Sequence, residues 1–303
     1  MKVLLTGASS FTGYWFAKAL TEAGHEVVAP LFRARAAYAG DTRAERVSAL
    51  ESILRLVPDC AFGSPAFMAL LDERFDLLAH HAATVGDYRS DDFDITGAVA
   101  ANTHNLRDIL GRGKLRGMVL TSSVFAQGEG AGTAPLPAFS PYGLSKGITS
   151  DIVTYRAAEA DLPLGRFVIP NPFGPLEEPR FCAYLIRSWK AGETASVRTP
   201  AYVRDNIHVD LLARAYCRYA EDLLADCAAA ALYPSGYVES QGAFATRFAA
   251  EMRSRLGLAC ELELAHQTEF SEPAFRVNTD LATVFVPDWD EQAAWDNIGE
   301  FYK

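Results

Sequence analysis

The sequence has few cysteines and no long apolar run, and both shortages exclude classes of protein. Its five cysteines are odd in number and show no Cys-x-x-Cys spacing, so neither a disulfide framework nor a zinc site is expected. No apolar run reaches the roughly 18 residues that a membrane-spanning helix needs. The N-terminus enters a strand-like run at once and lacks a signal-peptide pattern. We therefore expect a cytoplasmic protein without bound metal, whose thiols are free and buried: Cys60, Cys182, Cys217, Cys227 and Cys260.

Positive charge is also in short supply. The chain has 28 lysines and arginines against 38 aspartates and glutamates, and its formal net charge is −10. This balance argues against nucleic acid or an anionic membrane as a partner. A phosphate-bearing small molecule is still compatible with it, because local arginines and helix N-termini decide whether such a ligand binds.

Short apolar runs alternate with helical patterns through the first two thirds of the chain. A parallel pair of strands needs a crossover connection, which is usually a helix, so this alternation predicts parallel β-α units. Near-continuous apolar runs are typical of strands that are covered on both faces. We predict an α/β fold with a doubly wound, Rossmann-like parallel sheet of about six or seven strands. The strand-like runs are 3–5, 25–32, 56–60, 75–83, 117–123 and 164–170, with helix-like segments at 11–24, at 91–110 and from 141 onward.

The pattern changes after residue 171. Prolines cluster around Gly174 and predict a loop. Helix-like stretches follow at 209–224 and 241–256, with few convincing strands. We assign residues 1–170 to one domain and residues 171–303 to a smaller, mixed lobe. The boundary between them is soft, because segments of the second part can complete the first.

The stretch TGASSFTG at residues 6–13 follows the first strand-like run and opens the first helix. Gly7 suits the sharp turn at the strand end, and Gly13 lets the helix pack closely against the strand. The first helical turn then offers backbone N–H groups and its positive dipole end to a pyrophosphate. Ser10 stands where a middle glycine is expected, and its hydroxyl is a candidate for direct phosphate contact. The pattern alone also fits a merely structural turn.

Tyr142 and Lys146 lie four residues apart in SPYGLSK, so on a helix both side chains project from one face. A phenol has a reference pKa of about 10, too high for acid/base work at neutral pH. A nearby lysine ammonium favours the phenolate and lowers that pKa, which makes the pair a compact proton donor or acceptor. The plain alternative is an ordinary tyrosine and lysine on a surface helix.

Three hydroxyls, Thr121 to Ser123, end the strand-like run at 117–123. Ligands of open α/β sheets bind at the carboxyl ends of the strands, so a hydroxyl there can hydrogen-bond a substrate carbonyl. A Ser/Thr-rich loop after a strand is the plain alternative. The glycine loop, the hydroxyls and the Tyr-x-x-x-Lys pair in this order are far more specific than any one of them.

Together these motifs resemble the extended short-chain dehydrogenase/reductase family, the group of NAD(P)-dependent nucleotide-sugar epimerases, dehydratases and ketoreductases, through nearly the whole chain. TGASSFTG resembles the family's cofactor loop, with Ser10 in place of its middle glycine. HHAA at 80–83 resembles a turn that lines the cofactor, and PNPFGP at 170–175 resembles the segment between nicotinamide and substrate. VRDNIHVDLLARA at 203–215 resembles the start of the substrate lobe. By this resemblance residues 1–170 bind the dinucleotide and residues 171–303 bind the substrate.

The resemblance also implies a role for single residues. Tyr142 is the acid/base, Lys146 lowers its pKa and holds the nicotinamide ribose, and a strand-end hydroxyl orients the substrate. The family places that hydroxyl four residues before an aromatic; Phe125 in this place selects Thr121, with Ser122 as the neighbouring candidate. The pair Asp59 and Cys60 lies near the adenine, Asn102 belongs to the helix after the fourth strand, and Arg204 faces a sugar-nucleotide phosphate. The implied cofactor residues are Gly7, Ser9, Ser10, Phe11, Thr12, Gly13, Arg33, Arg35, Asp59, Cys60, His81, Ala82, Ala83, Asn102, Tyr142, Lys146 and Pro170, and the implied substrate residues are Asn171 and Arg204.

The choice between NAD and NADP depends on the end of the second strand. NAD selection normally uses an acidic residue on the ribose 2′-hydroxyl, and the run APLFRAR at 29–35 has none. Arg33 and Arg35 are candidates for charge-assisted hydrogen bonds to a 2′-phosphate, which favours NADP. The alternative is that both arginines are solvated loop residues.

We therefore expect an enzyme that moves hydride at a keto or hydroxyl carbon of a nucleotide sugar, as an NAD(P)-dependent 4-ketoreductase or epimerase. NADP would favour the reductase, because epimerases of the family keep tightly bound NAD. A dehydratase is disfavoured, since Ser122 and Ser123 stand where its Asp-Glu pair would be. The alternatives are a reductase of a small non-nucleotide carbonyl compound and a non-catalytic dinucleotide sensor. The resemblance further implies a homodimer through helices around 91–110 and 141–160.

Overall fold

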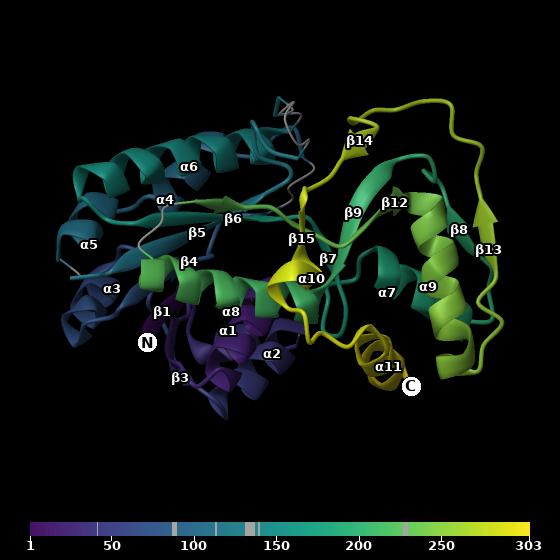
Figure 1. Cartoon of the computed structure of the whole chain (residues 1–303), viewed down its shortest axis with the longest axis horizontal. Coiled ribbons are helices and arrows are strands. Elements are labelled where there is room, and N and C mark those ends of the chain that lie inside the picture. The colour runs from purple at the N-terminus through teal and green to yellow at the C-terminus, as the bar shows by residue number, and fades with distance from the viewer. Residues whose placement is uncertain (41, 87–89, 113, 131–136, 139, 227–229) are drawn as a thin grey trace.

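A parallel sheet flanked by helices forms one part of the molecule, on the left in Figure 1, and a lobe lies beside it. The computed structural model describes residues 1–40, 42–86, 90–112, 114–130, 137–138, 140–226 and 230–303. Seven strands pair in the order β10-β6-β5-β4-β1-β2-β3, and every pairing is parallel. The predicted doubly wound, Rossmann-like α/β fold is confirmed. The strands are β1 (Lys2–Thr6), β2 (Glu26–Pro30), β3 (Arg55–Val57), β4 (Leu77–His80), β5 (Gly117–Ser123), β6 (Leu164–Ile169) and β10 (Ala231–Leu232).

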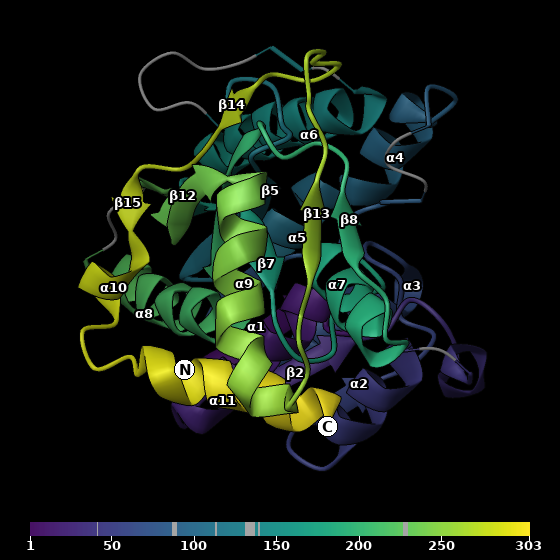
Figure 2. The same cartoon turned by 90° about the vertical axis from the view of Figure 1, so that its right-hand side faces the viewer.

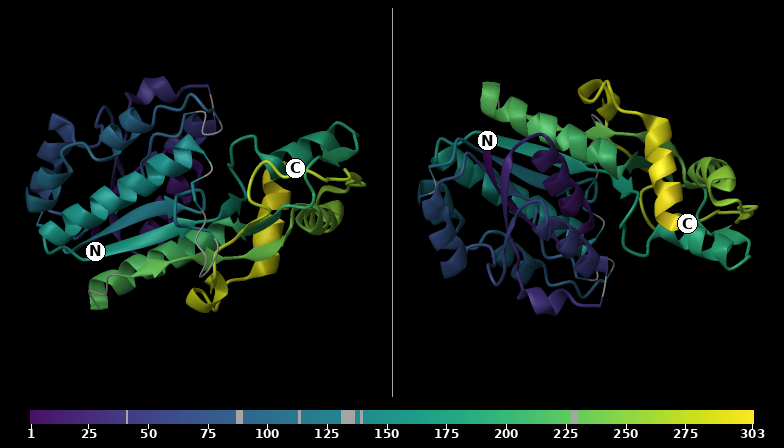
Figure 3. Two further views of the ribbon diagram at one scale, coloured as in Figure 1. Left: turned by 90° about the horizontal axis from the view of Figure 1, so that it is seen from above. Right: turned by 90° about the horizontal axis from the view of Figure 1, so that it is seen from below.

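Helices cover both faces of this sheet, as the two views of Figure 3 show. One face carries α1 (Phe11–Glu22), α2 (Thr42–Glu51) and α8 (Val209–Asp226). The other carries α3 (Pro65–Leu70), α4 (Ile95–Asn102), α5 (Leu106–Arg112) and α6 (Pro141–Glu159). Two short 3₁₀ turns, η1 (Arg35–Tyr38) and η2 (Leu71–Glu73), complete this part.

The apolar strand runs are explained by burial on both faces. Successive side chains of a strand point to opposite sides, so Val3 and Leu5 enter the core beneath α1 and α8, and Leu4 enters the core beneath α3 and α5. All three are fully buried. Each such side chain contributes about 1.5–3 kcal/mol when it leaves water, which stabilises the sheet between its two helical layers.

The helix expected at 91–110 is two helices, α4 and α5, and this expectation was wrong. Asn105 adopts a left-handed conformation with φ of 52°, which ends the helical path. Its side-chain amide donates to the Gly63 carbonyl at 2.8 Å. A Cβ atom on Gly63 would lie 2.2 Å from the carbonyl oxygen of His104. The break is therefore caused by close tertiary packing that periodicity does not encode.

The second part of the chain both completes the sheet and builds a lobe beside it (Figure 2). α8 and β10 belong to the layers of the central sheet, whereas β9 carries β7, β12 and β14 in the lobe. Buried aromatic residues, among them Phe173, Phe248 and Trp295, form the core of the lobe. Its elements are β7 (Asn171–Phe173), α7 (Phe181–Lys190), β8 (Ala195–Val197), β9 (Val203–His208), β11 (Pro234–Ser235), β12 (Tyr237–Ser240), α9 (Gln241–Leu256), β13 (Leu262–Leu264), β14 (Phe275–Arg276), β15 (Asp280–Leu281), α10 (Ala282–Phe285) and α11 (Glu291–Tyr302).

Arg46 of α2 ties the lobe to the loop between β1 and α1. Its side chain is fully buried, and a buried guanidinium is tolerated only when its donors are paired. It donates to the carbonyls of Ser9 at 3.0 Å and Leu176 at 2.7 Å, and to the Glu178 carboxylate at 2.8 Å. The Trp15 indole adds a bond to the Pro175 carbonyl at 3.1 Å.

The described cysteines are buried and not disulfide-bonded: Cys60, Cys182, Cys217 and Cys260. Cys227 lies outside the described residues. Among the helices that the structure describes, none combines the length and the apolarity required to cross a bilayer.

Burial of His208 on β9 predicts a measurable acid sensitivity. Burial lowers the pKa of its imidazole to about 3, and the ring Nδ1 accepts a bond from the Asp210 amide at 3.1 Å. In the unfolded chain His208 becomes protonated below about pH 6.5, whereas in the folded protein it stays neutral down to about pH 3. The free energy of unfolding therefore carries no penalty from His208 above about pH 6.5 and decreases as the pH falls from there toward 3. His208→Gln should flatten the pH dependence of the unfolding free energy by about 1 kcal/mol per pH unit between about pH 5 and 6.

Urea unfolding at several pH values measures this slope. His104→Gln, at an exposed histidine, is the matched control and should leave the slope unchanged. Equal slopes for wild type and His208→Gln would contradict the assignment.

Candidate active site

The predicted site residues gather at the carboxyl ends of the central strands. From β1 the chain adds β2 and β3 toward one edge of the sheet. It then returns to β4, on the other side of β1, and adds β5 and β6 toward the opposite edge. The crevice at this reversal, between β1 and β4, is where open α/β sheets bind ligands. The loop 7–10 after β1 and the segment 81–84 after β4 form its two walls.

Two glycines let these walls touch. Gly7 has φ of 79°, and a Cβ on it would lie 2.8 Å from the amide nitrogen of Ala82. A Cβ on Gly13 would lie 2.1 Å from the Gly7 carbonyl oxygen. Phe11 is buried and fixes the first turn of α1 in the core. The first amides of that turn have no acceptor within the helix, and Gly7 and Gly13 present no side chain beside them, which suits a pyrophosphate.

Ser10 acts as the N-cap of α1, and its hydroxyl bonds are all made within the protein. Oγ donates to the Gly7 carbonyl at 2.8 Å, accepts from the Gly13 amide at 3.1 Å and lies 3.1 Å from His81 Nε2. A hydroxyl has one proton and two lone pairs, so these three partners use its whole capacity. The structure thus gives Ser10 a capping role at the start of α1, and the expected direct contact with phosphate stays a prediction.

The segment after β4 is held from two sides. Thr6 Oγ1 accepts from the amides of His81 at 3.1 Å and Ala82 at 2.9 Å. Asn102 at the end of α4 accepts from the Thr84 amide at 3.0 Å through its side-chain oxygen. Asn102 is buried, so its side chain shapes this wall, which also includes Ala83.

Tyr142 and Lys146 lie one turn apart on α6, as the spacing predicts. Ser140 caps this helix by accepting from the Gly143 amide at 3.2 Å, and Pro141 occupies the first helical position. Tyr142 is therefore in the first turn, where the positive end of the helix dipole favours a phenolate. Its ring packs edge-to-face on Phe93 with centroids 5.9 Å apart.

Lys146 is a buried cation with one backbone anchor. It is 6% exposed, and its Nζ donates to the Thr121 carbonyl at 2.7 Å. Burial lowers the pKa of its ammonium to about 8. Burial lowers the pKa of His80 to about 4, although the bond of its ring to the Asn102 carbonyl acts in the opposite direction. Burial, and next the charge of Lys146, lower the pKa of His81 to about 3. Both histidines are therefore neutral at physiological pH.

The strand-end hydroxyls divide between the two faces of the sheet. Thr121 follows Val119 onto the face covered by α8, where Tyr216 is its neighbour. The structure therefore does not bring the Thr121 hydroxyl to Lys146; only its carbonyl is there. Ser122 lies on the α6 face and is buried. Ser123, which the sequence did not single out as catalytic, ends β5 and accepts from the Phe125 amide at 3.3 Å.

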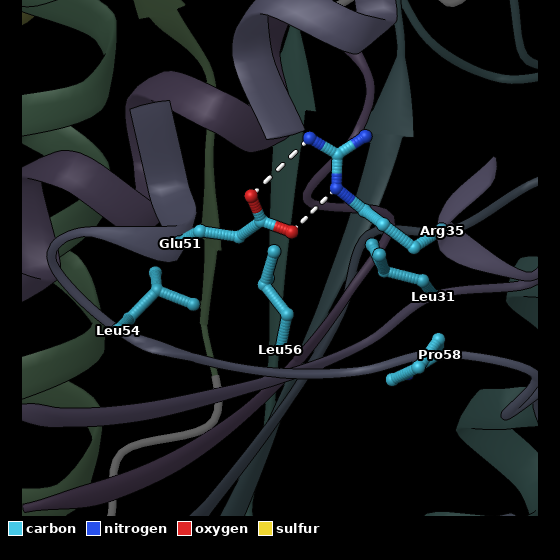
Figure 4. A pocket seen from close by; sticks show the side chains of 6 residues that line it. All are labelled: Leu31, Arg35, Glu51, Leu54, Leu56 and Pro58. Atoms are coloured by element: carbon cyan, nitrogen blue, oxygen red, sulfur yellow. Dashed lines mark hydrogen bonds and ion pairs between the residues drawn. The ribbon is translucent and has the colours of Figure 1, made fainter. Parts of the chain in front are cut away.

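The two arginines after β2 have different surroundings. Arg35 is ion-paired with Glu51 through Nε and through Nη2, the latter at 3.2 Å (Figure 4), and Nη2 also donates to Ser48 at 2.7 Å. The hydrogen bond to Glu51 raises the pKa of Arg35. Its charge is thus already balanced, and the structure does not support the expected Arg35 clamp. Arg33 is exposed, and among the described residues none pairs with its guanidinium.

Asp59 and Cys60 cross-link the loops after β2 and β3. Asp59 has φ of 53°, and its amide donates to the Arg33 carbonyl at 3.3 Å. The Cys60 amide donates to the Leu31 carbonyl at 2.8 Å. The Cys60 thiol is buried, which raises its pKa, so it is an inert part of the core.

Two arginines of the lobe lie on adjacent strands. Arg204 on β9 and Arg276 on β14 are register partners on adjacent parallel strands. Arg204 donates to Glu272 at 3.2 Å and to the Pro273 carbonyl at 3.1 Å. Arg276 is 1% exposed, and its guanidinium carbon lies 4.9 Å from the centre of the Phe125 ring. Burial, and next the charge of Arg204, lower the pKa of Arg276 to about 10.

The sequence did not single out Arg276. No motif marks it, and it meets Arg204 only because β14 pairs with β9, a strand far earlier in the chain. Nearby, Pro170 is buried after β6, and Asn171 is anchored by a bond from its side-chain amide to the Asp205 carbonyl at 3.1 Å.

The switch-point crevice and the glycine-lined approach define a dinucleotide-binding α/β protein. The chain belongs to the NAD dependent epimerase/dehydratase family, whose model matches residues 3–226. The predicted membership of the extended short-chain dehydrogenase/reductase family is thereby confirmed, as is the prediction that the protein is an enzyme of this type. No curated protein matches the chain by sequence.

Solved structures support the fold over the full length. A UDP-glucuronic acid 4-epimerase variant from Bacillus cereus, in complex with NAD and UDP-4-deoxy-4-fluoro-glucuronic acid, superposes with a TM-score of 0.78 at 17% identity over 100% of this chain and 99% of its own. UDP-glucose 4-epimerase from Thermotoga maritima, with UDP-glucose, gives 0.74 at 18% over 100% and 98%. UDP-glucose 4-epimerase from Thermus thermophilus, with NAD, gives 0.70 at 18% over 100% and 99%.

The unequal surroundings of Arg33 and Arg35 predict unequal effects on cofactor choice. Arg35→Ala should leave the ratio of NADP to NAD affinity within about twofold of wild type, because Glu51 already neutralises the charge. Arg33→Ala should lower that ratio by about three- to tenfold, the value of one exposed charge-assisted bond. Calorimetric titration with both dinucleotides measures the ratios, with Arg112→Ala as a control for a distant arginine. A larger effect at Arg35 than at Arg33 would contradict this reading.

Proposed function

We propose that the protein is an NAD-dependent nucleotide-sugar epimerase that inverts a hydroxyl-bearing carbon of the sugar. The observation that carries the proposal is the placement of the Tyr142–Lys146 pair on α6 together with the Arg204–Arg276 pair of the lobe. The first is a proton-transfer pair and the second is an anion-binding pair. Family membership and the UDP-sugar 4-epimerases among the solved structures support the same reading.

The chain fits a nicotinamide dinucleotide. The α1 N-terminus, approached over Gly7 and Gly13, would hold the pyrophosphate, and Lys146 would hold the nicotinamide ribose. Bound NAD supplies a reversible hydride acceptor for oxidation and re-reduction of the sugar carbon. The Arg35–Glu51 pair and the NAD-dependent family favour NAD over NADP.

Proton transfer falls to Tyr142. As a phenolate it accepts the sugar hydroxyl proton while the carbon is oxidised, and it returns the proton when the carbon is reduced from the other face. The Lys146 ammonium and the dipole of α6 both favour the phenolate, so the tyrosine works nearer neutral pH. Ser122 or Ser123, at the end of β5, would hydrogen-bond the sugar oxygen in place of Thr121.

The nucleotide diphosphate would lie against Arg204 and Arg276. Two guanidinium groups on adjacent strands repel each other, and this repulsion contributes to the lowered pKa of Arg276. A diphosphate relieves the repulsion and forms charge-assisted hydrogen bonds. Arg204 is ion-paired with Glu272, so a bound diphosphate would compete with the Glu272 carboxylate for the Arg204 guanidinium.

The exposed Arg33 guanidinium, with which none of the described residues pairs, favours a second candidate function, an NADP-dependent 4-ketoreductase. Identification by mass spectrometry of the nucleotides that co-purify separates the two. Retained NAD that is not consumed during turnover of a UDP-sugar supports the epimerase. Stoichiometric consumption of NADPH would instead show that the protein is the reductase.

Removal of the phenol should abolish most turnover. Tyr142→Phe is expected to lower kcat for UDP-sugar epimerisation by about 10²–10⁴-fold, the usual contribution of general acid/base catalysis, without weakening NAD binding. Tyr155→Phe, at an exposed tyrosine on the same helix, is the matched control. Coupled turnover assays and NAD titration give the two readouts. Turnover of Tyr142→Phe within a few-fold of wild type would remove this residue from the mechanism.

Neutralising the buried arginine should weaken the nucleotide selectively. Arg276→Gln should raise the Kd for UDP by about tenfold or more, because a hydrogen bond to a charged group is worth about 1.5–3 kcal/mol, and should leave the Kd for NAD unchanged. Arg247→Gln, on α9 of the same lobe, is the control, and Arg204→Gln covers the case in which Arg276→Gln does not fold. Calorimetry with UDP reports the result. Unchanged UDP affinity in both folded variants would place the diphosphate elsewhere.

A further inference from the structure

We infer that His81 is a positioning residue for the cofactor loop. Its Nε2–H donates to Ser10, the serine at the middle glycine position, and to Thr12, and so holds the loop in a shape that can bind the cofactor. The inference rests on the proposed function only in taking NAD as the ligand of this loop. Three side chains carry it: Ser10, Thr12 and His81, from the loop after β1, the first turn of α1 and the segment after β4.

His81 Nε2 lies between two hydroxyls of the opposite wall. It is 3.1 Å from Ser10 Oγ and 3.0 Å from Thr12 Oγ1. The ring is braced from behind by Phe16 of α1, edge-to-face at 5.1 Å between centroids. These contacts join the two walls of the crevice through side chains, in addition to the bonds that Thr6 Oγ1 accepts from the amides of His81 and Ala82.

Proton accounting fixes the tautomer. The single Ser10 proton is donated to the Gly7 carbonyl, and one Ser10 lone pair accepts from the Gly13 amide. The remaining lone pair needs a donor, so His81 carries its proton on Nε2 and shares it between Ser10 and Thr12. Nδ1 is then an acceptor; it is buried and has no hydrogen-bond partner among the described residues. The nearby charges and titrating groups are Lys146 and His80, and neither favours a cationic ring.

The arrangement determines which amides remain for the ligand. A serine at this position takes the Gly13 amide for its own cap, and the Ser10 amide donates to the Gly7 carbonyl at 3.0 Å. The amides of Phe11 and Thr12, the first two of the helix, have no acceptor within an α-helix. By holding Ser10 and Thr12 together, His81 fixes the orientation of these two amides toward the pyrophosphate. A loop with glycine at the middle position would instead let its backbone come closer to the pyrophosphate.

The test compares two substitutions that differ in the donor. His81→Leu keeps an apolar contact with Phe16 and removes the N–H, whereas His81→Gln places an amide N–H at the reach of Nε2. We expect His81→Leu to raise the Kd for NAD by about 2- to 13-fold, as for one net hydrogen bond, and His81→Gln to recover most of that loss. The apparent KM for NAD should rise with the Kd, with a smaller effect on kcat at saturating NAD. His25→Leu is the matched control, because His25 directly precedes β2 at the amino end of the strand, whereas the site lies at the carboxyl ends.

A double-mutant cycle separates positioning from general packing. Ser10→Ala combined with His81→Leu should cost less than the sum of the two single effects, because both delete the same bond. Additive effects, or equal losses in His81→Leu and His81→Gln, would overturn the inference. If His81→Leu does not fold, Thr12→Val and His81→Gln still test the shared proton. Failure of the wild type to bind NAD would refute the proposed function, whereas NAD binding without UDP-sugar turnover would leave this inference standing.

Discussion

The approach of the β1–α1 loop to the segment after β4 is the contact on which the rest of the site depends. It requires that Gly7 carry no side chain, since a Cβ would lie 2.8 Å from the Ala82 amide nitrogen. It also requires Thr6 to accept two amides across the crevice. Any larger residue at position 7 would push the two walls apart and move the first turn of α1 away from the crevice.

The site concentrates positive charge in an acidic protein. The chain carries a net charge of −10, yet Lys146 and Arg276 are buried cations at the crevice, and the neighbouring histidines, His80 and His81, are neutral. Burial weakens the preference of each cation for its charged form, as the lowered pKa values of Lys146 and Arg276 show. An anionic ligand offsets that desolvation, so such a site favours phosphate-bearing molecules.

The lobe is tied to the sheet by polar contacts that converge on the loops of the site. Arg46 joins the Ser9 carbonyl to Leu176 and Glu178, and Asn171 bonds to β9 directly after β6. The same loops that would hold the dinucleotide therefore position the strand that carries Arg204. The Arg46 guanidinium is fully buried, so its donors have no water to replace these partners, and it holds the loop after β1 against the start of the lobe.

Local sequence was sufficient for the sheet, because apolar runs of the first six strands and the helices between them are encoded within short windows. It was sufficient as well for the glycine loop and for the Tyr142–Lys146 pair, since helical spacing alone puts the two residues on one face. It was insufficient at Asn105, where contact with Gly63 ends a helix that periodicity continues.

Contacts between distant segments decided the remainder. The face on which Thr121 lies follows from strand alternation within the folded sheet, and the pairing of Arg35 with Glu51 follows from the return of α2. The Ser10 hydroxyl, which caps α1, lies 3.1 Å from Nε2 of His81, a residue 71 positions away in the chain. Arg276 reached Arg204 through the pairing of β14 with β9. The amino-acid sequence determined the sheet, the glycine loop and the placement of Tyr142 and Lys146 on one helix face through local geometry. The partners of each polar group were decided by tertiary structure, because hydrogen bonds and charges act through space.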